Sequence, residues 1–194
     1  YAKLTFEYHN ISEFRRGGNL LDLPPHETDI TEQTDHQING GGLKFDLFSK
    51  NERHRLSVYT SAQHTKRQSY YGAGHDPYAY GSTTDMTFVG GSQYNYESER
   101  CLFMPATFTG GMEYSYDDLQ DRMLGYNRTI SQTVHIGSLF AQNEWKNHYW
   151  SLLIGGRLDK HNLMDHVIFS PRANLRYNPT DDMNLRLSYS SGFR

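Results

Sequence analysis

The sequence has little cysteine, no long apolar run and no excess of charge of one sign. Its single cysteine, Cys101, excludes an internal disulfide and a zinc site built from several cysteines. No stretch approaches the roughly 18 consecutive apolar residues of a membrane-spanning helix, and the mean hydropathy is −0.77. With 19 basic against 22 acidic residues and a net charge of −3, the chain is too balanced for a dedicated nucleic-acid binder.

Enzyme signatures are missing as well. The chain contains no HExxH, GxSxG, P-loop or GxGxxG motif, so we predict neither catalysis nor a bound cofactor. The sequence is instead rich in tyrosine, with 15 residues, and in glycine, with 17. This composition is compatible with a β-barrel membrane protein, because its strands alternate lipid-facing and lumen-facing residues and a hydropathy average hides them.

Alternation of apolar and polar residues with a period of two predicts strands along most of the chain. In the C-terminal segment, for example, Met183, Leu185 and Leu187 share one face, while Asn184 and Arg186 lie on the other. Most of these segments span about 11 residues, close to the roughly 9 to 11 that a tilted transmembrane strand needs. The nine predicted strands lie near residues 1–9, 38–48, 53–66, 87–97, 103–116, 130–145, 149–159, 167–177 and 183–194.

The predicted connections alternate between long and short along the chain. The long connections are residues 10–37, 67–86, 117–129 and 160–166, and the short ones are residues 49–52, 98–102, 146–148 and 178–182. In an up-and-down meander every second connection lies on the same side, so one side carries short turns and the other long loops, as in bacterial outer-membrane barrels. The fold class predicted is therefore all-β, an antiparallel meander within a larger transmembrane barrel. Because nine is odd, we expect residues 1–194 to form one partial barrel domain.

Three runs of sequence resemble the TonB-dependent outer-membrane receptors. The run FSPRANLRYNPTDDMNLRLSYSSGFR, residues 169–194, is similar to a hairpin of that family, with Ser-Pro-Arg opening one strand and Gly-Phe-Arg ending the next. The run FAQNEWKNHYWSLLIGGRLDKH, residues 140–161, resembles the preceding hairpin, although Asn143 departs from the common Gln-Asp-Glu-Trp pattern. The segment RRGGNLLDLPPHETDITEQTDH, residues 15–36, resembles a long extracellular loop of the family.

The resemblance implies a barrel of about 22 strands in the outer membrane of a Gram-negative cell. It also implies a plug domain, absent from this sequence, and the inner-membrane TonB complex as partners. The ligand would be a scarce small molecule: an iron-siderophore, haem, cobalamin or another metal complex. Two alternatives stay open, namely a passive porin or adhesin barrel and a soluble β-sandwich or propeller that binds glycans.

The aromatic loop at residues 67–86 is a candidate ligand site. It carries Tyr70, Tyr71, His75, Tyr78 and Tyr80 on glycine-rich backbone. Aromatic side chains offer large contact area at a small cost in entropy, which suits a planar or bulky ligand. The alternative is that these tyrosines belong to the aromatic belts and loops of any such barrel.

Two further groups are candidates for binding. Asp159, His161, Asp165 and His166 could supply nitrogen and oxygen ligands to a metal, although a solvated loop explains them as well because their spacing matches no established motif. Five arginines lie on the predicted lumen-facing stripe, where we expect them to contact the plug or to attract an anionic ligand. These are Arg157, Arg172, Arg176, Arg186 and Arg194.

Overall fold

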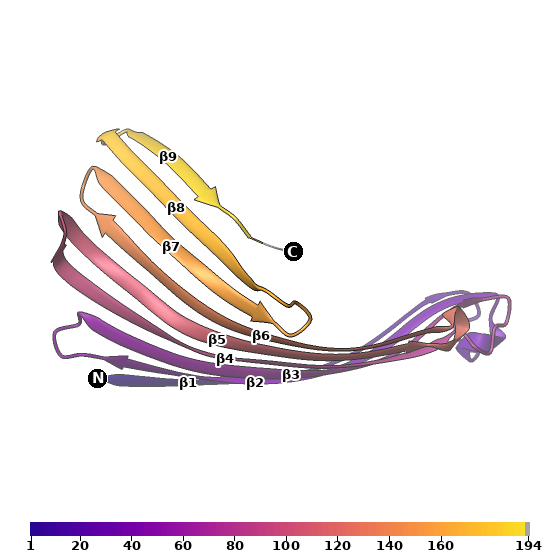
Figure 1. The fold of residues 1–194 in the computed structure, drawn as a ribbon. Helices are drawn as coiled ribbons and strands as arrows, with labels where there is room; N and C mark the ends of the chain where they lie inside the picture. The colour runs from indigo at the N-terminus through magenta and orange to yellow at the C-terminus, as the bar shows by residue number, and fades with distance from the viewer. Residues whose placement is uncertain (193–194) are drawn as a thin grey trace.

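The structure is a computed structural model and describes residues 1–192. It consists of one nine-stranded antiparallel sheet in which every strand pairs with its neighbours in chain order (Figure 1). The strands are β1 (Ala2–Gly18), β2 (Ile30–Phe48), β3 (His54–Ala73), β4 (Tyr80–Cys101), β5 (Met104–Met123), β6 (Arg128–Lys146), β7 (Trp150–His161), β8 (Val167–Thr180) and β9 (Met183–Ser190). The prediction of an all-β, nine-stranded meander is confirmed.

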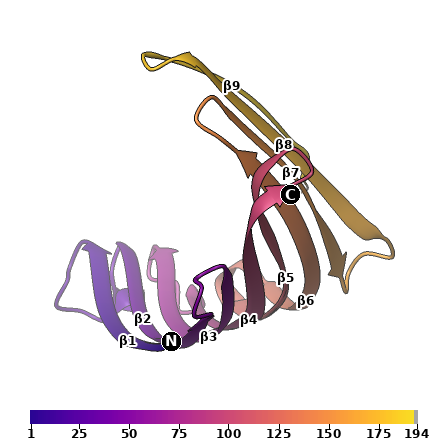
Figure 2. The same cartoon turned by 90° about the vertical axis from the view of Figure 1, so that its left-hand side faces the viewer.

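The sheet is a single curved layer (Figure 2). The side chains on its two faces differ in chemistry. Residues that are directly opposite in neighbouring strands point to the same face. Met112, Leu139 and Leu158 form one cross-strand row. Glu113, Ser138 and Asp159 form the adjacent row on the other side. We call the first side the apolar face and the second the polar face.

The apolar face has no protein packed against it within residues 1–192. Leu187 and Phe6 are each 70% exposed, and Met112 is 57% exposed. Burying one such side chain contributes roughly 1.5–3 kcal/mol, so a face composed of them requires an apolar environment. A soluble β-sandwich would supply that environment with a second sheet, whereas a barrel in a membrane takes it from lipid. The single layer favours the membrane barrel.

Aromatic belts mark the two edges of this apolar band. Trp150 stacks on Tyr177 with ring centroids 4.0 Å apart at the short-turn end. Trp145 lies in the same belt, at the short-turn end. The second belt lies further along the sheet, toward the long-loop end, and contains His135 in contact with Tyr114. Trp145 and His135 are both on β6 and 145 − 135 = 10 residues apart, or about 33 Å along the strand. With a strand tilt of about 40°, that length spans about 25 Å, the height of the apolar band of a membrane barrel.

The strands at the long-loop end reach further than the sequence predicts. Residues 10–37 are predicted as a connection, yet β1 continues to Gly18 and β2 begins at Ile30. The predicted connections at residues 67–86 and 117–129 are likewise mostly strand. Beyond the second aromatic belt, at the long-loop end, both faces of the sheet are polar. The alternation of apolar and polar residues that predicts a strand therefore disappears there. The backbone hydrogen bonds of the ladder continue regardless of side chain.

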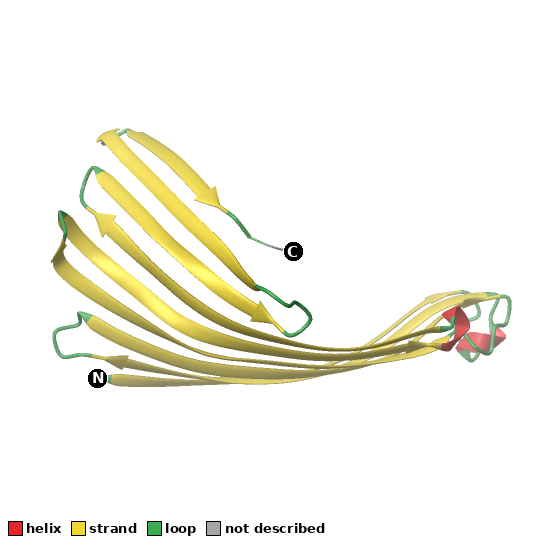
Figure 3. Ribbon diagram, viewed as in Figure 1, coloured by secondary structure: helices red, strands yellow, loops and turns green. Residues whose placement is uncertain are grey.

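Successive connections lie at opposite ends of the sheet (Figure 3), and each connection at one end is longer than the connections before and after it at the other end. Short turns join β2 to β3, β4 to β5, β6 to β7 and β8 to β9. At the opposite end, the connections from β1 to β2 and from β5 to β6 contain the 3₁₀ turns η1 (Pro25–Glu27) and η2 (Leu124–Tyr126). Across residues 1–192, no helix is long and apolar enough to cross a membrane.

Candidate functional site

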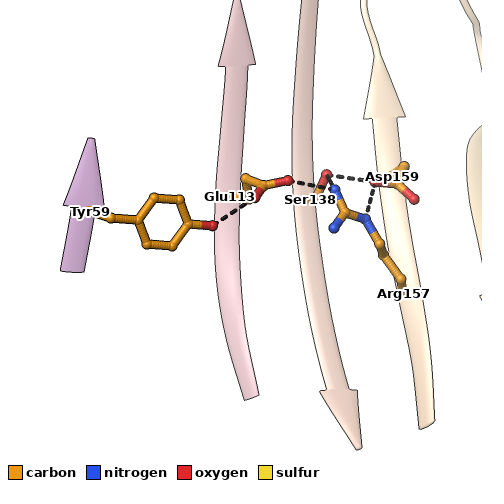
Figure 4. A network of polar contacts seen from close by, with 5 residues as sticks. All are labelled: Tyr59, Glu113, Ser138, Arg157 and Asp159. Atoms are coloured by element: carbon orange, nitrogen blue, oxygen red, sulfur yellow. Dashed lines mark hydrogen bonds and ion pairs between the residues drawn. The ribbon is translucent and has the colours of Figure 1, made fainter. Parts of the chain in front are cut away.

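A polar network joins four strands in the middle of the polar face (Figure 4). The guanidinium of Arg157 on β7 donates to Glu113 on β5 at 2.9 Å and to Asp159 at 2.8 Å. Ser138 on β6 donates to the same Asp159 oxygen at 2.5 Å. Tyr59 on β3 donates its hydroxyl proton to Glu113 at 2.6 Å. Charge-assisted hydrogen bonds of this kind fix the side chains rigidly.

A glycine allows this network to cross β4. Gly91 lies between Tyr59 and Glu113 in one cross-strand row. A Cβ atom at Gly91 would lie only 2.7 Å from the Tyr59 hydroxyl oxygen, so a larger residue there would push the tyrosine away from Glu113. Glycine within a strand is often the mark of such a close approach.

A second network lies near the short-turn end. Asp46 on β2 accepts hydrogen bonds from Ser57 at 2.5 Å and from Arg55 at 3.0 Å, both on β3. Lys44 lies 3.6 Å from its other oxygen. Asp46 is only 3% exposed, and its paired cations offset the cost of burying its charge.

A third network lies beyond the aromatic belt, at the long-loop end. Asp121 on β5 accepts a hydrogen bond from Thr83 at 2.6 Å and one from Arg128 at 2.7 Å, and Arg67 lies 3.6 Å away. The carboxyl is 6% exposed. The hydrogen bond from Thr83 and the hydrogen bond and charge of Arg128 hold the pKa of Asp121 below its ordinary value of 3.8, against the opposing effect of burial.

The network of Asp121 predicts a pH-dependent stability of this end of the sheet. Because the folded-state pKa is lowered, the carboxylate stabilises the fold above its ordinary pKa of 3.8 and stops doing so as the pH falls through the folded value. We expect Asp121→Asn to lower the protection of β5 and β6 amides by about 1–2 kcal/mol at pH 7. Hydrogen exchange measures this, with the exposed loop residue Asp22→Asn as a control. A difference that persists undiminished well below pH 3.8 would contradict the assignment.

The arginines of β8 and β9 differ from Arg157 because they have no carboxylate partner among residues 1–192. Arg172, Arg176 and Arg186 all lie on the polar face and form no ion pair with any residue of the described chain, 1–192. Arg176 is directly opposite Arg186. Arg194, the fifth arginine predicted for this stripe, lies outside the described residues.

An open groove runs along the polar face between Arg172 and the central network. It encloses about 400 Å³ and is lined by residues from β3 to the segment after β9. Tyr59 and Glu113 lie on one side of it, and Arg172 and Ser190 on the other. Because strands so far apart in the sheet border one groove, the polar face is concave here.

The aromatic loop predicted as a ligand site forms a packed tip. Tyr70 is 1% exposed, donates to the Asp76 carbonyl at 2.9 Å and contacts the Tyr80 ring edge-on at 4.9 Å. The Tyr80 hydroxyl is 2.8 Å from His26 Nδ1, which ties this loop to the first long connection. Burial raises the pKa of Tyr70, and Asp76 raises it further, so the phenol keeps its proton. Tyr70 and Tyr80 therefore hold the tip together.

The other three candidates of this loop lie outside the contact between Tyr70 and Tyr80, and Tyr80 is itself 38% exposed. Tyr78 is 69% exposed. His75 is exposed, has a left-handed backbone with φ +62°, and lies 3.3 Å from Asp29. Tyr71 is half-buried, and its carbonyl accepts a hydrogen bond from Tyr126. Tyr78 and His75 are thus the most accessible of the candidates that do not hold the tip together, and Tyr71 lies beside them with only part of its side chain exposed.

Comparison with known proteins identifies the family. The family model described as "TonB dependent receptor-like, beta-barrel" matches residues 3–194, nearly the whole chain. The chain belongs to the TonB-dependent receptor family. None of the curated proteins compared with it matches. The prediction made from the hairpin motifs is confirmed, and with it an outer-membrane location and a general role as a receptor and transporter.

Membership of the TonB-dependent receptors orients the sheet. In outer-membrane barrels the short turns are periplasmic and the long loops extracellular, while the apolar face contacts lipid. The polar face then lines the lumen, and the tip built around Tyr70 projects from the cell surface. The network of Asp121 is also extracellular, since it lies beyond the second aromatic belt.

The weak metal candidates do not come together in this receptor barrel. Asp159 on β7 is engaged by Arg157 and Ser138 on the polar face. His161 ends the strand and accepts the amide proton of Leu163. Asp165 and His166 lie in the connection to β8. Nowhere in residues 1–192 do three or more His, Cys, Asp or Glu side chains gather in a way that could hold a metal ion.

Sequence reasoning did not find the partners of Arg157. The alternating pattern placed Arg157 and Glu113 on polar stripes, but these residues are 44 positions apart and the pattern contains no information on strand register. The one signal in the sequence was the glycine pair Gly90-Gly91 inside a predicted strand, because a strand glycine often marks a close approach of neighbouring groups. Asp121 was missed because its segment was predicted to be a loop.

Proposed function

We propose that this chain is part of a receptor that uses TonB-derived energy to import a scarce ligand across the outer membrane. The ligand classes proposed are an iron-siderophore, haem, cobalamin or another metal complex. The observation that carries the proposal is the match to the receptor barrel family over residues 3–194, together with the polar, concave face that borders a groove of about 400 Å³. A passive porin would have no need of a plug or of TonB.

The central role proposed for the polar face is to hold the plug domain. The network of Arg157, Glu113 and Asp159 provides a rigid polar wall on which a plug can rest. The arginines of β8 and β9 provide cations beside it that form no ion pair within the described part of the chain. In this arrangement the residues 1–194 are one part of the barrel, and the plug and the remaining strands belong to the rest of the protein.

The test is an uptake assay with the full-length receptor. A Gram-negative strain that lacks its own receptors would be supplied with this protein and given radiolabelled iron-siderophore, haem or cobalamin. We expect uptake of one class to require both the receptor and an intact TonB complex. Diffusive entry that is independent of TonB would point to the porin alternative.

The extracellular tip supplies a prediction of its own for ligand capture. We expect the combined replacement of Tyr71, His75 and Tyr78 by alanine to weaken ligand binding at least about tenfold, because contact area from two tyrosines is lost. Equilibrium binding to whole cells measures this. The matched control is Tyr149→Ala in the short connection before β7, at the opposite end of the sheet, where the tyrosine is 55% exposed. Unchanged affinity in the triple variant would remove these residues from the ligand site.

A further inference from the structure

The outer side of the sheet changes in chemistry beyond the second aromatic belt. On β3, β4 and β5, six residues on the same side as the apolar face form two adjacent cross-strand rows. All six side chains are exposed, and they comprise two cations, two amides, two hydroxyl groups and no carboxylate. We call these residues the outer patch: Lys66, Thr84 and Gln120 in the first row, and Gln68, Ser82 and Arg122 in the second.

The polar face at the same height has a different composition. It carries the buried carboxylate of Asp121, with Arg67 and Arg128 as its cations. These charges balance one another within the described chain. Neither Lys66 nor Arg122 forms an ion pair with a carboxylate of residues 1–192. A common aqueous environment gives no reason for paired charges on one side of a strand and free cations among neutral hydrogen-bonding groups on the other.

The nearest carboxylates on the outer side do not neutralise the patch. Asp118 lies one row closer to the belt and accepts a hydrogen bond from Thr133 at 2.8 Å. Asp35 is directly opposite Gln68, at the margin of the patch on β2, and forms no ion pair with Lys66. The patch therefore has a positive potential, which favours an anionic partner.

The outer patch also lies higher than a phospholipid headgroup reaches. On β6 its first row continues to Ser131 and its second to Thr129. These positions are 135 − 131 = 4 and 135 − 129 = 6 residues beyond His135, or about 13 and 20 Å along the strand. With a strand tilt of about 40°, the patch lies about 10–15 Å above the second belt. Because phospholipid headgroups occupy only roughly 5–8 Å on each side of the hydrocarbon, only a larger headgroup reaches it.

The side chains of the patch indicate the chemistry of that headgroup. Lysine and arginine bind phosphate groups. Amides and hydroxyls both donate and accept hydrogen bonds, as the hydroxyl groups of a sugar require. Lys66 and Arg122 are two strands and one row apart, so their Cα atoms are about 12 Å apart with the neutral side chains between them. A phosphorylated sugar uses both kinds of group, whereas a small free anion uses only the cations.

We propose that the outer patch binds the phosphorylated saccharide headgroup of a glycolipid in the outer leaflet of the membrane. The acyl chains of this lipid lie against the apolar face directly below the patch, so the patch extends the surface that already contacts lipid. The inference rests on the orientation of the receptor barrel in the membrane. It does not depend on which ligand is imported or on TonB.

Site-specific photo-crosslinking in Gram-negative cells tests the identity of the occupant. The photoreactive residue p-benzoylphenylalanine replaces Thr84 in the full-length receptor, and we expect a covalent adduct with a phosphorylated glycolipid. The matched control places the same residue at Gln63, which is exposed on the polar face of β3, and should give no glycolipid adduct. An adduct with a protein at Thr84, or no adduct there, would overturn the proposal.

Removing the two charges tests the site itself. The full-length receptor is placed in nanodiscs of phosphatidylcholine and lipopolysaccharide, and native mass spectrometry counts the lipopolysaccharide molecules that it retains. Lys66→Gln combined with Arg122→Gln should weaken retention at least about tenfold. The control combines Arg15→Gln on the polar face with Lys50→Gln in a short turn. It removes the same charge from two other exposed positions and should retain as much as the wild type.

A last pair of probes separates the phosphate from the rest of the headgroup. Lipopolysaccharide treated with a phosphatase should bind the wild type about as weakly as the untreated lipid binds the double variant. Inorganic phosphate should not displace the untreated lipid, because it offers no sugar hydroxyls. Equal retention by the wild type and the double variant, undiminished binding of the dephosphorylated lipid, or displacement by inorganic phosphate would each show that the patch is not a site for a phosphorylated glycolipid.

Discussion

Leu139→Arg will destabilise the barrel by about 2–4 kcal/mol, because it places a charge at the middle of the lipid-facing band. Leu139 is 57% exposed on the apolar face, in one row with Met112 and Leu158. It lies between the belts that His135 and Trp145 define on the same strand, so its arginine could not easily reach either membrane surface. The measurement is urea-induced unfolding of the full-length receptor in phospholipid vesicles.

The control for this prediction uses the same strand and the same face. Ser131 is exposed on β6 beyond the aromatic belt, where the sheet is surrounded by water. Ser131→Arg should change the free energy of unfolding by less than about 0.5 kcal/mol. Equal losses in the two variants would mean that the apolar face does not lie in lipid at the depth of Leu139.

The fold could be predicted where one face of a strand meets lipid and the other meets polar groups. Around Met183, Leu185 and Leu187 the two environments produce a strict alternation, and β9 is found there. Around residues 10–18 and 30–37 both faces of the strands meet water. Apolar and polar residues therefore do not alternate with a period of two, and the strands could not be recognised from the sequence. Although these strand ends were predicted to be loop, the alternation of longer and shorter connections was predicted correctly. It depends only on the side of the membrane on which each connection lies.

The candidate site could be predicted only in part, for a similar reason. The polar stripe predicted that Arg157, Arg172, Arg176 and Arg186 share one face, and the structure has all four on the polar face, because the face that a residue takes follows from its position within a strand. Which of them are paired depends on register between distant strands. A one-residue change of register would move Glu113 to the opposite face. The tip shows the same limit: the five aromatic candidates share one loop in sequence, but only packing determines that Tyr70 is buried while Tyr78 is not.

The central network provides the second large effect. Arg157→Met leaves Glu113 and Asp159 without a cation, and Asp159 is only 3% exposed. Removing one member of a buried ion pair costs about 3–5 kcal/mol. The Arg157 side chain is 39% exposed, so we expect solvent screening to reduce the loss to about 2–3 kcal/mol. Urea-induced unfolding in vesicles again measures it.

Two comparison variants show whether charge or volume causes this loss. Arg122→Met removes an exposed arginine and should change stability by less than about 0.5 kcal/mol. Combining Arg157→Met with Glu113→Gln should recover part of the loss, because one of the two unpaired charges is then removed, and the double-mutant cycle gives the coupling directly. Losses that simply add would mean that Arg157 acts through packing alone. A positive coupling would establish the network as an ionic clamp across β5 and β7.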